Sequence, residues 1–365
     1  MTKVRASKLF ILLPFMLLCL AARAASAEGK EEGSHPLRCA VIATLTGGHA
    51  PIGHSIKNSI ILASEEGFLN DKVIFSFEDD AFLPRNTVSI VNKLISGKEA
   101  DCIILFGSTT SLAIAGLAEN AKIPTIAIAV SPKMIAGRKY IFRSYISLES
   151  QASLLSRRAD ELGYRSVAAI TTIQDATVSL REELFRRWSV EVTLNEQVNP
   201  EDLDLRSVAA RIAASGSDAV FLNLLPPQIA ALSRQLRVIG YKGDFFGGPP
   251  MGNIDEVAAS AGALEGAWFV SVDDARAEEF YSRYRQRFGE HPAVEGIYGY
   301  DLANILAQRP KGQDLREYLS GLKKFSGLLG SYGMEGNSLD IPAGVWTVSG
   351  GKLAGPAITG RKDTH

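Results

Sequence analysis

The feature that most constrains this chain is an alternation of short, continuously apolar runs with longer stretches of helical spacing. Apolar runs occur at residues 39–45, 73–77, 102–106 and 124–130, and segments with helical spacing lie between them at 53–67, 88–95 and 112–120. Continuous apolar strands separated by helices are typical of a parallel sheet that is covered on both faces. The pattern therefore predicts a doubly wound α/β unit.

The same pattern restarts after Phe142-Arg143. Strands are expected at 167–170, 190–194, 219–222 and 244–247, with helices at 149–163, 178–188, 205–214 and 228–239. Two more helices are predicted at 274–288 and 297–307, and a strand at 344–348. The tail is too short for a third βαβ series, so we expect it to return and complete the first two units.

These patterns predict an α/β protein with two doubly wound, Rossmann-like lobes joined by a hinge of several crossovers. We expect the first lobe to hold residues 37–143 and about 272–330, and the second lobe to hold 144–271 and about 331–358. Open α/β sheets bind ligands outside the carboxyl ends of their strands. Two such lobes predict a ligand cleft between them that closes on a small molecule.

Length and charge exclude several classes of protein. The chain has 365 residues, with 39 basic and 40 acidic side chains and a net charge of −1, and 46% of its residues are hydrophobic. A chain of this size holds about two full cores, which excludes disorder and small disulfide scaffolds. No basic face is large enough for a run of phosphates, so no nucleic acid partner is expected.

The first 27 residues have the composition of an export signal. Basic residues precede the apolar stretch 9–20, and Ala25-Ser26-Ala27 has the small residues that a signal peptidase cleaves after. We therefore predict a signal peptide at 1–27, cleaved after Ala27, and an exported protein. Cys19 follows Leu18, where a lipobox has a small residue, so lipidation is not favoured.

Two cysteines, Cys39 and Cys102, follow the predicted cleavage site, and each opens an apolar run. Neither has a second thiol or a histidine at metal-ligand spacing, which argues against a redox or metal site. Export would place both cysteines in an oxidising environment, where disulfides persist. A structural disulfide and two buried thiols both remain open.

Motifs of enzymes and of metal or nucleotide binding are not found. The sequence has no Gly-x-Ser-x-Gly, no His-Glu-x-x-His and no Walker A motif. His49 and His54 are interpreted as solvated loop residues, and the adjacent Asp79 and Asp80 as loop and capping groups, because neighbours on a strand point to opposite faces. We expect no enzyme activity, no cofactor and no metal.

Three segments at strand ends carry small residues with hydroxyls and free backbone groups. They are Thr46-Gly-Gly48, Gly107-Ser-Thr-Thr-Ser111 and Ala129-Val-Ser131. Hydroxyls and amides in the first turn of a helix form an anion-binding site, and a carboxylate is the ligand that we expect there. Plain N-capping by Ser108 or Thr109 explains the second segment equally well.

At these segments the chain resembles the type I periplasmic binding proteins, in their leucine/isoleucine/valine-binding branch. The resemblance lies in ATLTGGHAPIG at 43–53, ASEE at 63–66, FEDD at 77–80, FGSTTS at 106–111, SP at 131–132, FR at 142–143, DAVF at 218–221 and YD at 300–301. It covers nearly the whole chain after residue 27.

The resemblance implies a periplasmic solute-binding protein with the type I fold, which closes over a small-molecule ligand and delivers it to the membrane permease of an ABC importer. A monomer is expected. By position, Ser111 would hold a ligand carboxylate, while the Ala129 carbonyl and the Ser131 hydroxyl would take an ammonium. Thr46 and Thr109 are further candidate contacts of this lobe.

The second lobe departs from the family's amino-acid site. Pro249 stands where amino-acid binders carry an acid, and the family's aromatic positions fall at Ile52, at Ala176 beside Asp175, and at Leu225. Met251 and Tyr298 are candidate apolar walls or core residues.

Burying an ammonium without a carboxylate is costly, so these changes favour a less polar aliphatic or aromatic acid over an amino acid, unless Asp175 moves in. The loss of aromatic walls also widens the expected cleft. A different function remains open on the same fold, namely a sensory or accessory binding protein that has no role in transport.

Overall fold

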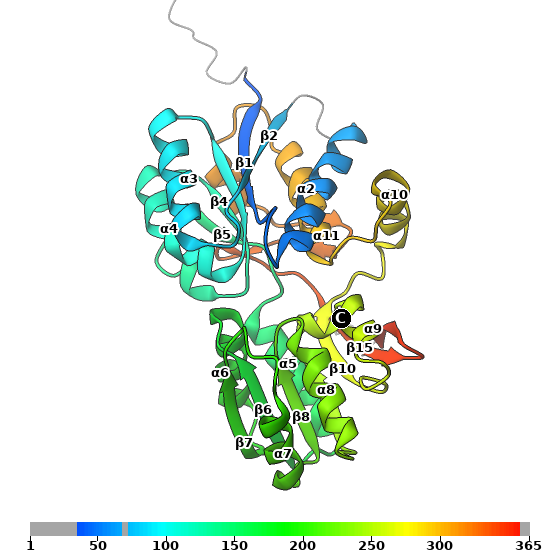
Figure 1. Cartoon of the computed structure of the whole chain (residues 1–365). Helices are drawn as coiled ribbons and strands as arrows, with labels where there is room; N and C mark the ends of the chain where they lie inside the picture. The colour runs from blue at the N-terminus through cyan, green and yellow to red at the C-terminus, as the bar shows by residue number, and fades with distance from the viewer. Residues whose placement is uncertain (1–34, 68–71, 358–365) are drawn as a thin grey trace, which may run out of the picture. The chain divides into compact units, whose positions relative to one another are not determined.

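The computed structural model describes residues 35–67 and 72–357. The predicted signal peptide and its cleavage site lie outside the described residues. Two seven-stranded sheets dominate the described part, and a two-stranded sheet adds to them. Each large sheet forms a lobe with its own helices, and Figure 1 labels many of the elements of both lobes.

The first sheet has the strand order β13-β14-β5-β4-β3-β1-β2. All neighbouring strands are parallel except β13, which is antiparallel to β14. Its strands are β1 (Leu37–Ala43), β2 (Val73–Asp79), β3 (Cys102–Phe106), β4 (Thr125–Ile128), β5 (Ile141–Arg143), β13 (Met334–Glu335) and β14 (Ser338–Leu339). The central strands β3 and β4 are almost wholly buried, which explains their continuous apolar sequence.

Helices cover both faces of this sheet. The core on one face includes residues of α3 (Pro84–Gly97) and α4 (Ser108–Ala121), with the short turn η1 (Pro132–Met134) beside them. The core on the other face includes residues of α2 (Ala50–Glu65), α10 (Glu278–Phe288), α11 (Glu295–Ala307) and α12 (Leu315–Ser320). This second core also takes residues of the two-stranded sheet, β11 (Phe325–Gly327) and β12 (Gly330–Tyr332).

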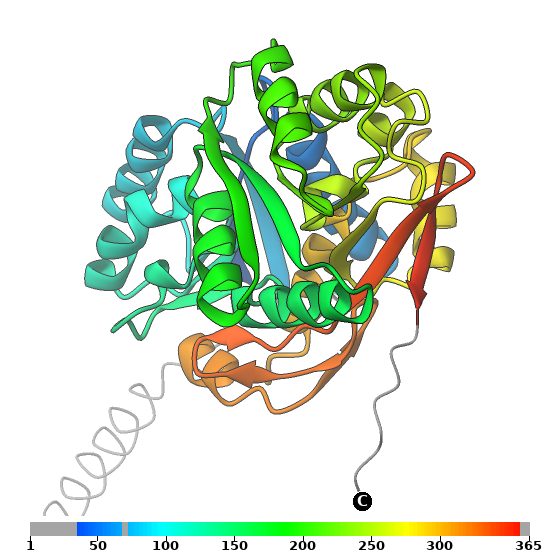
Figure 2. The same cartoon turned by 90° about the horizontal axis from the view of Figure 1, so that it is seen from below.

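The second sheet repeats the order of the first, as β16-β15-β10-β9-β8-β6-β7. Its strands are β6 (Ser166–Thr172), β7 (Glu191–Val198), β8 (Ala219–Asn223), β9 (Asp244–Gly247), β10 (Trp268–Val272), β15 (Ala343–Ser349) and β16 (Lys352–Ala357). The strands β6 to β10 are parallel, and β15 and β16 form an antiparallel hairpin at the edge, drawn in red in Figure 2. The internal repeat that the sequence pattern predicted is therefore present.

Two helix layers also flank the second sheet. The core on one face includes residues of α5 (Leu148–Glu161) and α6 (Asp175–Arg187). The core on the other face includes residues of α7 (Arg206–Ser215), α8 (Gln228–Val238) and α9 (Ile254–Ala259), next to the turn η2 (Pro249–Gly252).

The tail returns to both sheets, as expected, but its division differs from the prediction. We expected residues from about 331 onwards to belong to the second lobe. Instead, β13 and β14 extend the first sheet, because Ser338 pairs with Arg143 of β5. The chain crosses to the second sheet only after β14, and β15 then pairs with β10.

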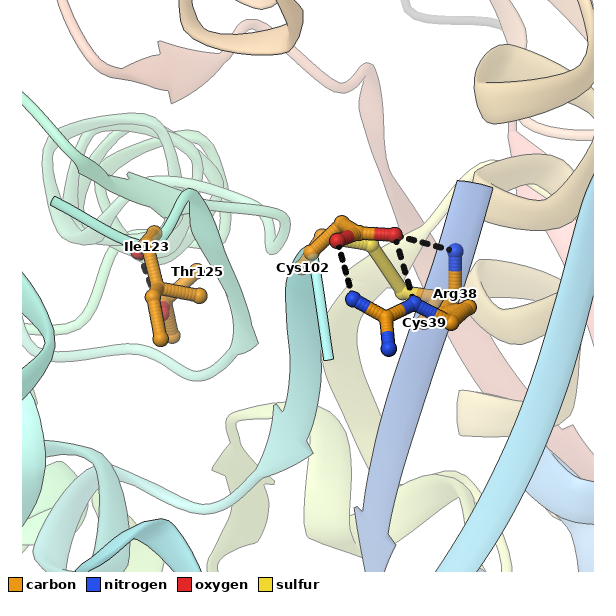
Figure 3. The surroundings of a disulfide bond; sticks show 6 residues. Arg38, Cys39, Cys102, Ile123 and Thr125 are labelled. Atoms are coloured by element: carbon orange, nitrogen blue, oxygen red, sulfur yellow. Dashed lines mark hydrogen bonds and ion pairs between the residues drawn. A yellow bond between two sulfur atoms is a disulfide. The ribbon is translucent and has the colours of Figure 1, made fainter. Parts of the chain in front are cut away.

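Cys39 and Cys102 form a disulfide, so the alternative of two buried thiols was wrong. The two residues are register partners on β1 and β3, with a Cα–Cα distance of 4.7 Å, and both are buried. Figure 3 shows the bond with Arg38 beside it. The guanidinium of Arg38 donates to the carboxylate of Asp101, which precedes β3 and closes the same end of the strand pair.

None of the helices in the described residues is long and apolar enough to cross a membrane.

Candidate functional site

The carboxyl ends of β1, β3 and β4 lie at one edge of the first sheet and carry three of the predicted segments. The strand order reverses between β1 and β3, which is where doubly wound sheets bind their ligands. The segment at 107–111 follows β3, and the segment at 129–131 follows β4. The Ser108 hydroxyl joins the two, because it accepts hydrogen bonds from the backbone amides of Val130 and Ser131, each at 3.2 Å.

The first turn of α4 is not capped as the N-capping alternative proposed. The N-cap residue is Gly107, with φ of +96°, and no side chain accepts a hydrogen bond there. The hydroxyls of Thr110 and Ser111 instead donate backwards to the Gly107 carbonyl, at 3.0 and 2.5 Å. Capping by Ser108 or Thr109 was therefore wrong, because Ser108 serves the β4 loop and Thr109 is exposed. An uncapped helix start retains its preference for an anion.

Ser131 combines full burial with an unused hydrogen-bonding group. Its side chain is 0% exposed, and its hydroxyl has no hydrogen-bond partner among the described residues. A buried hydroxyl without a partner is unusual because it loses its bonds to water and gains none in return. Ala129, two residues earlier, is buried in the same lobe. The Ser131 hydroxyl is therefore the strongest ligand-binding candidate of this edge.

Thr46 and Ile52 follow β1 at the same edge. The Thr46 hydroxyl donates to Asp79 at 2.7 Å, which fixes the exposed loop to the end of β2. Ile52 is half-buried and packs against the core of the first lobe. Gly53 allows this close fit, because a Cβ on it would lie 1.8 Å from the carbonyl oxygen of Thr44. As interpreted from the sequence, Asp79 and Asp80 serve as loop anchors, and Asp80 accepts from Thr44 and Thr87. Their predicted role in helix capping was wrong, because no side chain caps the start of α3 at Leu83.

One aromatic side chain at this edge, that of Phe82, was missed. The ring of Phe82 lies against Gly107, so close that a Cβ on Gly107 would be 2.5 Å from it. His49 packs against Phe82, with ring centroids 4.2 Å apart, and is half-buried, so its interpretation as a solvated loop residue was wrong. Burial lowers the pKa of His49 below its ordinary value. Phe82 adopts a positive φ, which no local sequence pattern indicates.

The second lobe gathers its predicted residues at the corresponding edge, where β6, β8 and β9 end. Asp175 and Ala176 begin α6, and both are half-buried. The backbone amide of Leu225 donates to the Thr172 hydroxyl at 3.1 Å, which ties the β8 loop to the end of β6. Pro249 is buried in the turn η2 that follows β9.

Met251 and Tyr298 are both core residues. Met251 is fully buried in one core of the second lobe, where its sulfur lies close to Gly247. Tyr298, on α11, is 1% exposed and stacks on Tyr145 with ring centroids 5.0 Å apart.

One ion pair connects the two edges. The ammonium of Lys133 lies 3.4 Å from Oδ1 of Asp175. Lys133 is in η1, two residues after Ser131, and Asp175 is the first residue of α6. Through this contact, the Asp175 carboxylate of the second lobe is linked to the loop that carries Ser131 in the first lobe. The sequence singled out Asp175 but not Lys133, because a pairing across 42 residues leaves no local pattern.

Within residues 35–67 and 72–357, no cluster of three histidine, cysteine or carboxylate side chains is arranged to hold a metal ion. The chemistry that the two edges offer is hydrogen bonding and charge: an uncapped helix start, an unpartnered hydroxyl and a carboxylate paired with a lysine.

The chain is similar to known proteins over most of its length. The family model described as "Periplasmic binding protein" matches residues 36–345. Among curated proteins, the Leu/Ile/Val-binding protein BraC3 of Rhizobium johnstonii is 24% identical over 246 residues, which cover 64% of this chain and 67% of that protein. A Leu/Ile/Val-binding protein homologue of Brucella suis is 25% identical over 301 residues, covering 77% and 80% of the two chains.

Solved structures show the same fold. The leucine-binding protein LivK of Thermotoga maritima superposes with a TM-score of 0.79 at 23% identity, covering 88% of this chain and 98% of its own. The substrate-binding protein LivJ of Streptococcus pneumoniae, in complex with isoleucine, also gives 0.79, at 18% identity and with 88% and 100% covered. A solute-binding protein of Rhodopseudomonas palustris in complex with benzoate gives 0.76, at 18% identity and with 88% and 95% covered.

Proposed function

Because the chain belongs to the periplasmic binding protein family, whose members are solute-binding proteins and not enzymes, we propose that it binds a small carboxylate-bearing ligand and delivers it to an ABC importer. The ligand lies between the two strand-end edges, and closure of the lobes holds it. The protein acts as a monomer in the periplasm, after export and cleavage behind Ala27.

The observation that carries this proposal is the buried, unpartnered hydroxyl of Ser131 beside an uncapped helix start. A ligand carboxylate satisfies both, since it accepts from the hydroxyl and from the first amides of α4. Ser111 joins the site by turning its hydroxyl from the Gly107 carbonyl to the ligand.

The second edge supports an acid that is less polar than a free amino acid. Pro249 occupies the position at which the family's amino-acid binders carry their acid, and Ala176 and Leu225 offer small aliphatic surfaces. Structural relatives accommodate both ligand types, with isoleucine in one and benzoate in another. The aliphatic residues of the second edge support a ligand of the second kind.

Isothermal titration calorimetry with a panel of aliphatic, aromatic and amino acids tests the proposal. We expect saturable binding of at least one carboxylate, and Ser131→Ala and Ser111→Ala each to weaken it by about 1–3 kcal/mol. Ser96→Ala is the matched control, because Ser96 is exposed on α3 and donates only to the Asn92 carbonyl. Absence of binding across the panel, or unchanged affinity in both site variants, contradicts the proposal.

Export and cleavage are tested separately. Mass spectrometry of the protein recovered from the periplasm of an expressing cell should give a chain that starts at Glu28. A chain that keeps its first 27 residues contradicts the proposed processing.

A further inference from the structure

Asp175 has one oxygen engaged and one buried without a partner. Oδ1 faces the ammonium of Lys133 at 3.4 Å, whereas Oδ2 is buried and accepts no hydrogen bond from the described residues. A carboxylate oxygen that has left water without gaining a donor is as unusual as the free Ser131 hydroxyl. The two unsatisfied groups thus occur at the two strand-end edges that the Lys133–Asp175 ion pair connects.

The charge of Asp175 is already balanced. Lys133 supplies one positive charge, and the start of α6 supplies the positive end of a helix dipole, which favours a negative side chain in the first turn. An amino acid that placed its ammonium at Oδ2 would add a second cation next to Lys133, and like charges repel. A neutral donor at Oδ2 meets no such repulsion and supplies the missing hydrogen bond.

We propose that this site takes a hydroxy-substituted carboxylic acid and not an amino acid, with the ligand carboxylate at Ser131 and the α4 start, and the ligand hydroxyl donating to Oδ2 of Asp175. This inference rests on the proposed function and adds the substrate class. Asp175 acts as the residue that determines specificity, and Lys133 sets what kind of donor Asp175 accepts.

Calorimetry with ligand pairs that differ by one hydroxyl tests the assignment. The pairs are benzoate with 3- and 4-hydroxybenzoate, phenylacetate with 4-hydroxyphenylacetate, and hexanoate with 6-hydroxyhexanoate, and leucine and isoleucine serve as zwitterions. For the wild-type protein we expect at least one hydroxylated member to bind tenfold or more tightly than its parent acid. In Asp175→Ala this ratio should fall to within threefold of one.

Lys133→Met provides the second variant. Removing the lysine leaves the Asp175 charge unbalanced, so leucine or isoleucine should gain tenfold or more relative to the hydroxylated acid. Lys93→Met is the matched control, because Lys93 forms a comparable exposed ion pair with Glu78 on the first lobe, and it should leave every ratio unchanged.

The outcomes separate the two proposals. If carboxylates bind but show no hydroxyl preference, or if leucine is the tightest wild-type ligand, the substrate class is wrong and the binding function stands. If no probe binds, the binding function fails and the substrate class fails with it. A hydroxyl preference that survives in Asp175→Ala also overturns the role given to Asp175.

Discussion

Cys39 of β1 and Cys102 of β3 are register partners on neighbouring parallel strands, and their disulfide closes a loop between residues 63 positions apart. The bond ties together the two strands between which the strand order reverses, near their amino ends and so at the end of the strand pair opposite to the Thr46 and Gly107 loops. Because both side chains are buried, the native fold shields the bond from reductants.

Removal of this disulfide should lower the free energy of unfolding by about 4 kcal/mol, because a loop of this length is strongly restricted in the unfolded chain. The variant is Cys39→Ala with Cys102→Ala, and the measurement is urea unfolding followed by circular dichroism. The control is the same titration on protein that has first been unfolded and reduced and is then kept in reductant, since wild type and variant should then nearly coincide. Equal stabilities under oxidising conditions would show that the bond does not form in solution.

Gly53 is a position at which a single methyl group should be poorly tolerated. A Cβ there would lie 1.8 Å from the Thr44 carbonyl oxygen, so Gly53→Ala must displace the loop after β1. We expect a loss of stability of about 1–3 kcal/mol and weaker ligand binding. Gly116→Ala is the matched control, because Gly116 lies inside α4 with open space around it, and alanine should raise stability by up to about 1 kcal/mol. Thermal unfolding of wild type, Gly53→Ala and Gly116→Ala measures these changes in stability. Equal melting temperatures for Gly53→Ala and the wild type would contradict the steric argument.

Most of the fold was predictable because each strand carries its own local pattern. The apolar run at 102–106 predicted β3 with both ends correct, and the run at 244–247 predicted both ends of β9. The strand β10, at Trp268–Val272, was overlooked although its apolar run between Gly266 and Asp273 was available in the sequence. In contrast, β13 and β14 have two residues each and exist only through pairing with distant strands, so no local pattern reveals them.

The candidate site was predictable in position but not in its contacts. Strand ends located Ser131, because the carboxyl ends of parallel strands share an edge, whereas Asp175 was singled out through the family resemblance. The use of Ser108 as an acceptor for the Val130 and Ser131 amides depends on how β3 and β4 align, and the Lys133–Asp175 pair depends on how segments 42 residues apart meet. Such tertiary contacts produce no characteristic spacing of residues in the sequence, so they could not be predicted from it.

Ser108 and Ser131 should respond differently to the loss of their hydroxyls. Ser108→Ala leaves the amides of Val130 and Ser131 without their acceptor, so we expect a loss of stability of about 1–3 kcal/mol. Ser131→Ala removes a group that has no partner, so the ligand-free protein should keep its stability within about 0.5 kcal/mol. Chemical unfolding without ligand measures both. A larger loss in Ser131→Ala than in Ser108→Ala would mean that the Ser131 hydroxyl has a structural partner.

Asp301 should make stability depend on pH in the mildly acidic range. This carboxyl on α11 accepts hydrogen bonds from the backbone amides of Leu328 and Leu329 and from the Tyr332 hydroxyl, and so fastens the β11–β12 hairpin. Burial raises the pKa of Asp301 to about 6, from an ordinary value of 3.8, although these hydrogen bonds act in the opposite direction.

A raised pKa means that the folded protein binds this proton more tightly than the unfolded chain does. The contribution of Asp301 to stability is therefore fully present below pH 3.8 and is lost as the pH rises through 6. In Asp301→Asn this contribution cannot titrate, so the change in unfolding free energy between pH 4 and pH 7 should differ from that of the wild type by about 2–3 kcal/mol. Urea unfolding at a series of pH values gives the two profiles, and comparison of their slopes removes any constant loss from the altered hydrogen bonds. Parallel profiles for wild type and Asp301→Asn would show that Asp301 titrates in the folded protein as it does in the unfolded chain.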